Sequence, residues 1–349
     1  RSQRTRRAWG IAFLVVLALV PIVGAAALAT TDRGLGGSVS KAWRSLTDPE
    51  ASTPSNDPSR LTAIGSVRAR YWRDAIDIFQ ARTLSGVGAG GYTTARLRFR
   101  DDDLDVLHAH GHLVQTAADL GLLGLGLTLA LLAAWLAATV RATGPWRGPG
   151  ARGENAERVG LLALGCVVVV FGVHSAVDWT WFIPGTVVPA LLCAGWVAGR
   201  GPWREPLVRV GGRRGVRVAG AVAVVLLAIL ASWSAAQPQK AVNQTDDALA
   251  ALAAGDIPKA RTLATDAGDT DPLSVDPLFA LSEVETAVQQ PVAAKAALER
   301  AVQLQPAVPD TWIRLAQFEL LAGDAAAAQK TVRPALYLDP RSAPATAVF

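Results

Sequence analysis

Cysteine, histidine and methionine are scarce in this chain. Its 349 residues include two cysteines and four histidines but no methionine, not even at position 1. Cys166 and Cys193 both lie within long apolar stretches, where a thiol behaves as a small apolar side chain. The sequence therefore predicts neither a disulfide nor a cysteine metal site. The missing methionine favours a C-terminal piece of a longer membrane protein, with further spans upstream.

Charged residues are also few, at 18%, whereas 51% of the residues are hydrophobic. This balance excludes an ordinary soluble domain, and a membrane-spanning helix needs about 17 to 25 apolar residues to cross ~30 Å of hydrocarbon. Five runs meet or approach that length: residues 8–29, 113–140, 159–173, 183–199 and 216–236. The third and fourth are short and flank a polar cluster, so a re-entrant hairpin is an alternative to two spans. Residues 1–29 also have the features of a signal peptide.

Arginine predicts the orientation of these spans. Residues 1–7, 141–158 and 200–217 are rich in arginine, and short loops of this kind stay cytoplasmic. A loop at 30–112 and a domain at 237–349 are then extracytoplasmic, on either side of four spans within 113–236. We expect a multi-pass protein of the plasma membrane, in contact with membrane lipid. Because the tail is acidic overall, the basic character comes from the loops and no nucleic-acid partner is implied.

The C-terminal tail contains an internal repeat. The pairs Asp271-Pro272, Gln305-Pro306 and Asp339-Pro340 recur at intervals of 34 residues, which is the tetratricopeptide period. Gly255-Asp256 and Gly323-Asp324 lie two periods apart, where each would turn one helix into the next. Two and a half to three repeats fit between residues 241 and 349. The predicted fold is all-α, a transmembrane bundle followed by an α-solenoid that binds a protein partner.

The outer loop carries two local patterns. Apolar residues recur at helical spacing from Val67 to Phe79, with arginines around them, which predicts an amphipathic helix lying at the membrane surface. The glycine-rich segment at 86–92 predicts a tight turn that ends this helix. It has no preceding strand and no Walker lysine, so a nucleotide site is not favoured.

All four histidines fall in the predicted outer segments. His108, His110 and His112 precede the second span, and His174 lies in the next outer turn. Three imidazoles within five residues raise the alternative of a metal site, but no cysteine completes it and the nearby carboxylates are those of Asp101, Asp102, Asp103 and Asp105. A second alternative is hydrogen bonding to lipid headgroups. We predict no metal and no cofactor.

Several motifs together resemble the O-antigen ligase and polymerase family. They are Arg68-x-x-x-Trp72-x-x-Ala75, the glycine-rich segment at 84–92, His110-Gly111 followed after nine residues by Gly121-Leu122-Leu123-Gly124, and His174-Ser175-x-Val177-Asp178. The resemblance spans about residues 60–200. Gly111 departs from the family pattern, in which this position usually holds asparagine.

The resemblance implies an enzyme that moves a glycan from a polyprenyl-diphosphate donor to an acceptor hydroxyl on the outer face of the membrane, without metal or nucleotide. Arg68 and His110 would be catalytic, and the expected substrate-binding residues are Trp72, Arg96, Arg98, His108, His174 and Asp178. The acceptor, whether glycan, lipid or protein, stays open. The alternatives are a polysaccharide polymerase, a protein O-glycosyltransferase and a non-enzymatic membrane-anchored scaffold whose repeat tail is the active part.

Overall fold

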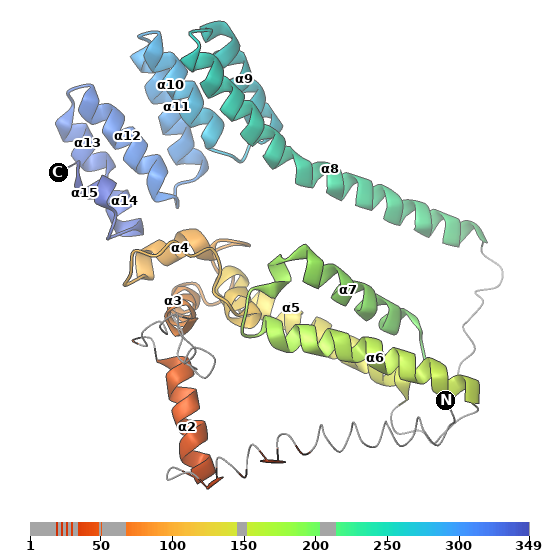
Figure 1. Ribbon diagram of the computed structural model, residues 1–349. Coiled ribbons are helices and arrows are strands. Elements are labelled where there is room, and N and C mark those ends of the chain that lie inside the picture. The colour runs from red at the N-terminus through yellow and green to blue at the C-terminus, as the bar shows by residue number, and fades with distance from the viewer. Residues whose placement is uncertain are drawn as a thin grey trace.

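The computed structural model describes residues 34–48, 50, 68–144, 152–202 and 214–348, together with six positions between 19 and 30 (Figure 1). Within these residues the regular structure is helical and contains no strand, which confirms the all-α prediction. The longer helices are α2 (Gly34–Thr47), α3 (Arg68–Ala81), α4 (Tyr92–Phe99), α5 (His112–Thr143), α6 (Arg152–Ser175), α7 (Pro184–Gly199), α8 (Arg214–Ala253), α9 (Ile257–Thr270), α10 (Asp276–Ala287), α11 (Pro291–Leu304) and α12 (Pro309–Leu321). The chain ends in the short helices α13 (Ala325–Thr331), α14 (Arg333–Leu338) and α15 (Ala343–Thr346).

Three of the described helices are long and apolar enough to cross a membrane. They are α5, the Ala156–Ser175 part of α6 and the part of α8 from Val218 onward. Helix α6 is longer than the predicted run at 159–173, because it extends beyond the apolar residues at both ends. Helix α7 has 16 residues and is about 24 Å long, less than the ~30 Å of hydrocarbon. The predicted span at 8–29 lies largely outside the described residues.

The apolar side chains of these helices are mostly uncovered. Leu127 on α5, Leu192 on α7 and Leu227 on α8 are 73%, 69% and 71% exposed. Contiguous apolar surface of this kind is rare on a soluble protein but is the surface that contacts lipid. The exposure confirms a membrane protein.

Helix α5 is interrupted at Gly121, and the glycine-rich turn packs against the break. Gly121 has φ +62°, and a Cβ at Gly121 would lie 2.5 Å from the carbonyl of Leu84. The amide of Gly88 donates to the carbonyl of Asp119 (2.8 Å), and the amide of Leu122 donates to that of Thr83 (2.8 Å). Backbones approach this closely only where side chains are absent. The glycines of the two motifs therefore belong to one structural unit.

Helix α3 differs from the prediction of a surface-lying helix. Its apolar face is covered by protein, since Tyr71, Ala75 and Ile78 are buried in a cluster with Tyr92, Val106, Ala109 and Ala118. The amphipathic pattern was correct, but α4, α5 and the connecting loop cover the apolar face instead of lipid. As a result α3 is fixed against the N-terminal end of α5.

The C-terminal helices confirm the tetratricopeptide-like repeat. The end of α8 pairs with α9, α10 with α11, and α12 with α13 and α14 (Figure 1). At the first and third turns Gly255 and Gly323 have φ +80° and +87°, and Asp256 and Asp324 cap the next helix. Residue 237, the predicted start of the tail, lies inside α8. The membrane-length segment therefore continues without interruption into the first repeat helix.

Candidate functional site

The carboxylate of Asp178 brings together side chains from three distant segments. Arg68 Nη2 on α3 lies 3.1 Å from Asp178 Oδ2, and His110 Nδ1 lies 3.2 Å from Asp178 Oδ1. His174 at the end of α6 is more distant, with its Nε2 3.8 Å from Oδ2. Four of the site residues predicted from sequence thus form one cluster, which we call the Asp178 cluster. Both predicted catalytic residues belong to it.

Trp72 and Gly111 fix the position of His110. The indole Nε1–H of Trp72 donates to the carbonyl oxygen of His110 (3.2 Å), and His110 has φ +52°, which is uncommon for a residue with a side chain. A Cβ at Gly111 would lie 3.0 Å from that indole nitrogen and 3.2 Å from the carbonyl oxygen of Ala176. Glycine at 111 therefore lets α3, the loop and the turn after α6 approach one another. Trp72 is placed to position His110.

The electrostatics of the cluster favour an ionised aspartate beside a neutral imidazole. Burial raises the pKa of Asp178, but the backbone N–H of Trp179, the Arg68 guanidinium and His110 outweigh it and hold the pKa below its usual range. Burial lowers the pKa of His110, and Asp178 only partly offsets this. Because an ionised carboxylate accepts, Nδ1 of His110 carries the proton. Its Nε2 is then the basic nitrogen.

The cluster is open to solvent. The side chains of Arg68, His110 and Asp178 are 36%, 27% and 22% exposed. A guanidinium has five N–H donors, so Arg68 can contact Asp178 and an incoming anion together. The arrangement combines a base, a cation and accessible space.

Aromatic rings surround the histidines and separate them. The ring of His108 stacks on Phe182 with centroids 3.9 Å apart, and His112 meets Trp181 edge-on at 5.1 Å. Because His110 instead faces Asp178, the three imidazoles do not converge. In the part of the chain that the structure describes, no group of three histidine, cysteine or acidic side chains has the geometry of a metal site.

Sequence reasoning missed the aromatic residues after Asp178. Trp179 lies 5.6 Å from the ring of His108, and the 3-10 helix η2 (Thr180–Phe182) supplies the other aromatic neighbours. The signal was present, because aromatic residues at the end of an apolar run are typical of a membrane interface.

Arg96 was predicted to bind substrate, and the structure places its side chain inside the protein. Its side chain is 1% exposed, with Nε 2.9 Å from Asp74 Oδ2 and Nη2 2.7 Å from Asp102 Oδ1. Its Nη1 donates to the carbonyl of Leu104 (2.9 Å). Burial alone would lower the pKa of Arg96, but these acidic partners outweigh it and raise the pKa. Arg96 joins α4 to α3 and the following loop from inside the protein.

Arg98 was also predicted to bind substrate, and it lies outside the Asp178 cluster. Its guanidinium carbon is 4.0 Å from the ring centroid of Tyr337 on α14. This contact places Arg98 at the junction between α4 and the repeat domain.

Asp119 is a further residue that sequence reasoning missed. Its carboxylate accepts hydrogen bonds from the backbone N–H groups of Tyr92 (2.8 Å) and Gly90 (3.2 Å), although Asp119 belongs to α5. It thereby satisfies the first amide of α4, which has no intrahelical partner, and an amide of the preceding turn. A carboxylate within an apolar run was the available signal, because such residues usually face protein.

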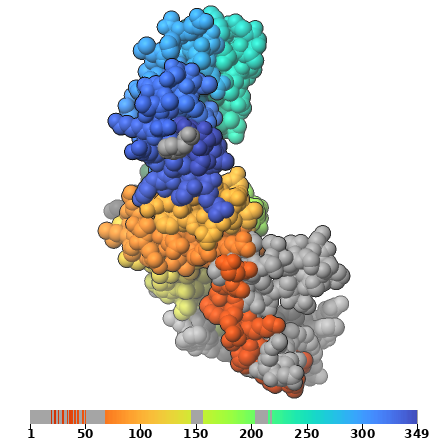
Figure 2. Space-filling view, turned by 90° about the vertical axis from the view of Figure 1, so that its left-hand side faces the viewer, coloured from red at the N-terminus to blue at the C-terminus, as the bar shows by residue number. Residues whose placement is uncertain are grey.

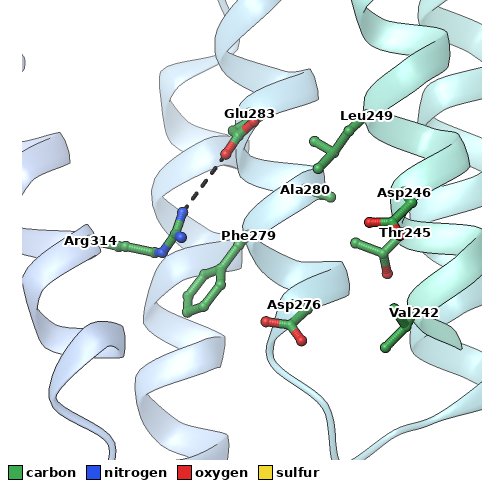
Figure 3. Close-up of a pocket in the computed structure, with 9 residues that line it drawn as sticks. All are labelled: Val242, Thr245, Asp246, Leu249, Asp276, Phe279, Ala280, Glu283 and Arg314. Carbon is green, nitrogen blue, oxygen red and sulfur yellow. Dashed lines mark ion pairs between the residues drawn. The ribbon is translucent and has the colours of Figure 1, made fainter. Parts of the chain in front are cut away.

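A small cavity of about 190 Å³ lies in the repeat domain, away from the Asp178 cluster (Figure 3). Its walls come from α8, α10 and α12, and its acidic lining residues are Asp246, Asp276 and Glu283. The guanidinium of Arg314 lies 4.4 Å from the ring centroid of Phe279 and 3.8 Å from Glu283. The cavity gives the repeat domain a mixed aromatic and charged recess.

The fold defines a membrane protein with a C-terminal helical-repeat domain. Comparison with known families refines this class. Residues 1–129 match the family model described as O-antigen ligase, and residues 285–348 match that described as a tetratricopeptide repeat. No curated protein matches the chain.

The two family matches confirm the resemblance seen in the sequence and support a membrane glycosyltransferase of the O-antigen ligase or polymerase type. The first match includes Arg68 and His110, whereas His174 and Asp178 lie beyond it.

Proposed function

We propose that this chain transfers a glycan from a polyprenyl-diphosphate donor to an acceptor hydroxyl, without a metal ion. The observation that carries the proposal is the contact of Asp178 with both Arg68 and His110. This contact places a cation and a base on opposite oxygens of one carboxylate. Glycan transfer from a diphosphate needs both groups, one for the leaving group and one for the acceptor.

Arg68 is proposed to bind the donor diphosphate. Its planar guanidinium can contact two phosphate oxygens at once, and such charge-assisted pairs are stronger than neutral hydrogen bonds. As the bond between the sugar and the diphosphate breaks, negative charge increases on the leaving group. A preorganised cation stabilises that charge more in the transition state than in the ground state.

His110 is proposed as the general base. Its Nε2 accepts the proton of the acceptor hydroxyl while the acceptor oxygen forms a bond to the anomeric carbon of the donor sugar. The bond from that carbon to the diphosphate breaks, and polyprenyl diphosphate leaves with the bonding electron pair. Asp178 stabilises the resulting imidazolium and fixes the tautomer, because it accepts from Nδ1 (3.2 Å).

The same end of the bundle is proposed to face the outside of the plasma membrane. His110 precedes α5 and Asp178 follows α6, and the arginine-rich loops lie at the opposite ends of these helices. Cysteines at Leu107 and Leu321, which are 63% and 90% exposed, test this in a chain lacking Cys166 and Cys193. An impermeant thiol reagent should label both in intact cells, whereas protection of either would contradict the orientation.

The deciding assay uses the full chain reconstituted in lipid with a polyprenyl-diphosphate glycan, in chelator. A lipid-linked sugar, a free glycan and a polypeptide as separate acceptors distinguish ligase, polymerase and protein-glycosylating activities. Transfer by wild type but not by His110→Ala or Arg68→Ala supports the proposal. Activity that disappears with chelator and returns with a divalent cation would overturn the metal-free mechanism.

A further inference from the structure

A cleft of about 680 Å³ separates the outer loop from the repeat domain. One wall consists of the end of α3, the glycine-rich turn and α4, and the other consists of residues 304–308 and α14. Figure 2 shows the last repeat helices, in dark blue, seated on the orange surface of the loop. The cleft thus joins two parts of the chain that lie far apart in sequence.

Ion pairs hold the two walls together. Arg100 Nη2 on the loop side lies 3.1 Å and 3.3 Å from the two carboxylate oxygens of Asp339, and these side chains are only 11% and 10% exposed. Arg341 Nε lies 3.0 Å from Asp103 Oδ1 nearby. A desolvated ion pair is screened less by salt than a surface pair. We therefore expect the contact of Arg100 with Asp339 to hold the two walls together at physiological ionic strength.

The charge of the lining is positive. Its ionisable members are Arg82, Arg98 and Tyr337, and none of its residues is acidic. Neither arginine forms an ion pair with a carboxylate among the residues that the structure describes, whereas Asp339 and Asp103 are engaged by Arg100 and Arg341.

The aromatic neighbours of Arg98 orient its guanidinium. This group lies over Tyr337 at 4.0 Å and near Phe99 at 5.4 Å. A guanidinium held against a ring by its face keeps its N–H edges available for a planar anion.

We infer that this cleft binds the anionic groups, phosphate or carboxylate, of an elongated acceptor glycan. The inference rests on the proposed function, because it assigns the acceptor of the same reaction. Ile78 in the cleft is ten residues from Arg68 on the same helix, which is about 15 Å along its axis. An acceptor held in the cleft must therefore be several units long for its end to reach His110.

The position of the cleft favours a soluble chain over a lipid headgroup. Helix α4 contacts α14 of the repeat domain, and it also contacts α3 and α5 (Figure 1). The cleft is on the side of α4 that faces the repeats and thus away from the membrane-length helix α5. Membrane lipid would reach the opposite side.

Binding of defined oligosaccharides tests the inference without the donor. The full chain in nanodiscs of zwitterionic lipid is titrated with oligogalacturonate, phosphorylated malto-oligosaccharide and neutral malto-oligosaccharide. At least one anionic probe should bind ten-fold or more tightly than the neutral one, and salt should weaken that binding. The better anionic probe identifies the anion as phosphate or carboxylate.

Charge-removing variants locate the binding. Arg82→Gln with Arg98→Gln should weaken anionic binding at least ten-fold, whereas Arg333→Gln, an exposed arginine of α14 outside the cleft, should not change it. Arg98→Lys keeps the charge and should bind less tightly than wild type if the planar group matters. Equal binding of charged and neutral probes, or unchanged binding in the double variant, would overturn the inference. Competition by nanodiscs of anionic lipid would show a lipid occupant instead.

The outcome is separable from that of the donor chemistry. Arg68 lies outside the cleft, so the Arg68→Ala variant should bind the anionic probe as wild type does. If Arg68→Ala transfers glycan normally while the cleft variants fail to bind, the proposed catalytic role is wrong and the cleft stands. If Arg68→Ala fails to transfer glycan while the cleft variants bind the anionic probe as wild type does, the cleft assignment is wrong and the mechanism stands.

Discussion

Arg68 and Arg96 show how two arginines of neighbouring helices can differ in burial. Arg96 is 1% exposed and bridges Asp74 and Asp102, so its charge is fully used inside the protein. Arg68 is 36% exposed, and Asp178, which it contacts, also contacts His110. Both arginines belong to the unit formed by α3, α4 and the N-terminal end of α5. Of the two, only Arg68 is accessible to solvent.

The difference follows from the surroundings of each guanidinium. A buried arginine requires compensating carboxylates, because an isolated charge in a medium of low dielectric is very costly. A half-exposed one keeps part of its hydration and can exchange water for a ligand. Removing Arg96 should therefore affect stability, and removing Arg68 should affect turnover.

The largest expected effect is on catalysis. His110→Ala should lower turnover by roughly 10² to 10⁴ while donor binding is largely retained, because a general base acts in the transition state. Arg68→Lys should stay severely impaired, since it keeps the charge but loses the planar group. Single-turnover assays with a labelled donor measure both effects. A wild-type rate in Arg68→Lys would remove the proposed distinction between the two arginines, and a wild-type rate in His110→Ala would contradict its role as the base.

The next effect is on folding. Arg96→Met should lower the free energy of unfolding by about 3 to 5 kcal/mol, because the buried Asp74 loses its close partner and keeps only Arg73, whose Nη2 lies 3.5 Å away. Thermal unfolding in detergent measures it, with Arg333→Gln as the exposed control. Adding Asp74→Leu to Arg96→Met should recover part of the loss. A fully stable but inactive Arg96→Met protein would instead place Arg96 in the reaction.

A smaller loss of stability is expected at the two contacting glycines. Gly86→Ala and Gly121→Ala should each cost about 1 to 3 kcal/mol, because both residues have positive φ and a Cβ would meet backbone atoms. Gly126→Ala in the same helix is the control, since nothing lies near its Cβ position. Unfolding midpoints compare the three variants. Equal midpoints would mean that the turn and the break in α5 do not depend on each other.

The smallest effect is a displacement of the pH profile. Because burial holds the pKa of His110 below its usual value of ~6.5, activity should persist below that pH and fall only as the imidazole becomes protonated. Asp178 raises this pKa and Arg68 lowers it. The acidic limb of the residual activity should move to lower pH in Asp178→Asn and to higher pH in Arg68→Gln. Shifts in the same direction would contradict the proposed charges.

The sequence by itself determined the elements whose signal is local. Apolar length marked α5 and α8, the 34-residue period marked the repeats, and glycine and aspartate marked their turns. The motifs also indicated Arg68 and His110, although 42 positions separate them. Each of these signals depends on residue type and spacing along one segment, so it can be read without knowing what lies opposite.

Tertiary structure alone decided the partners. Arg68, Arg96 and Arg98 look alike in sequence, yet one meets Asp178, one is buried between two carboxylates and one lies over Tyr337 of the repeat domain. In sequence, Asp178 is 110 positions from Arg68, Asp74 is 22 positions from Arg96, and Tyr337 is 239 positions from Arg98. The energy of a charge depends on its burial and on the groups around it, and both are properties of the folded chain. The role of each arginine was therefore fixed only when the loop, the bundle and the repeats came together.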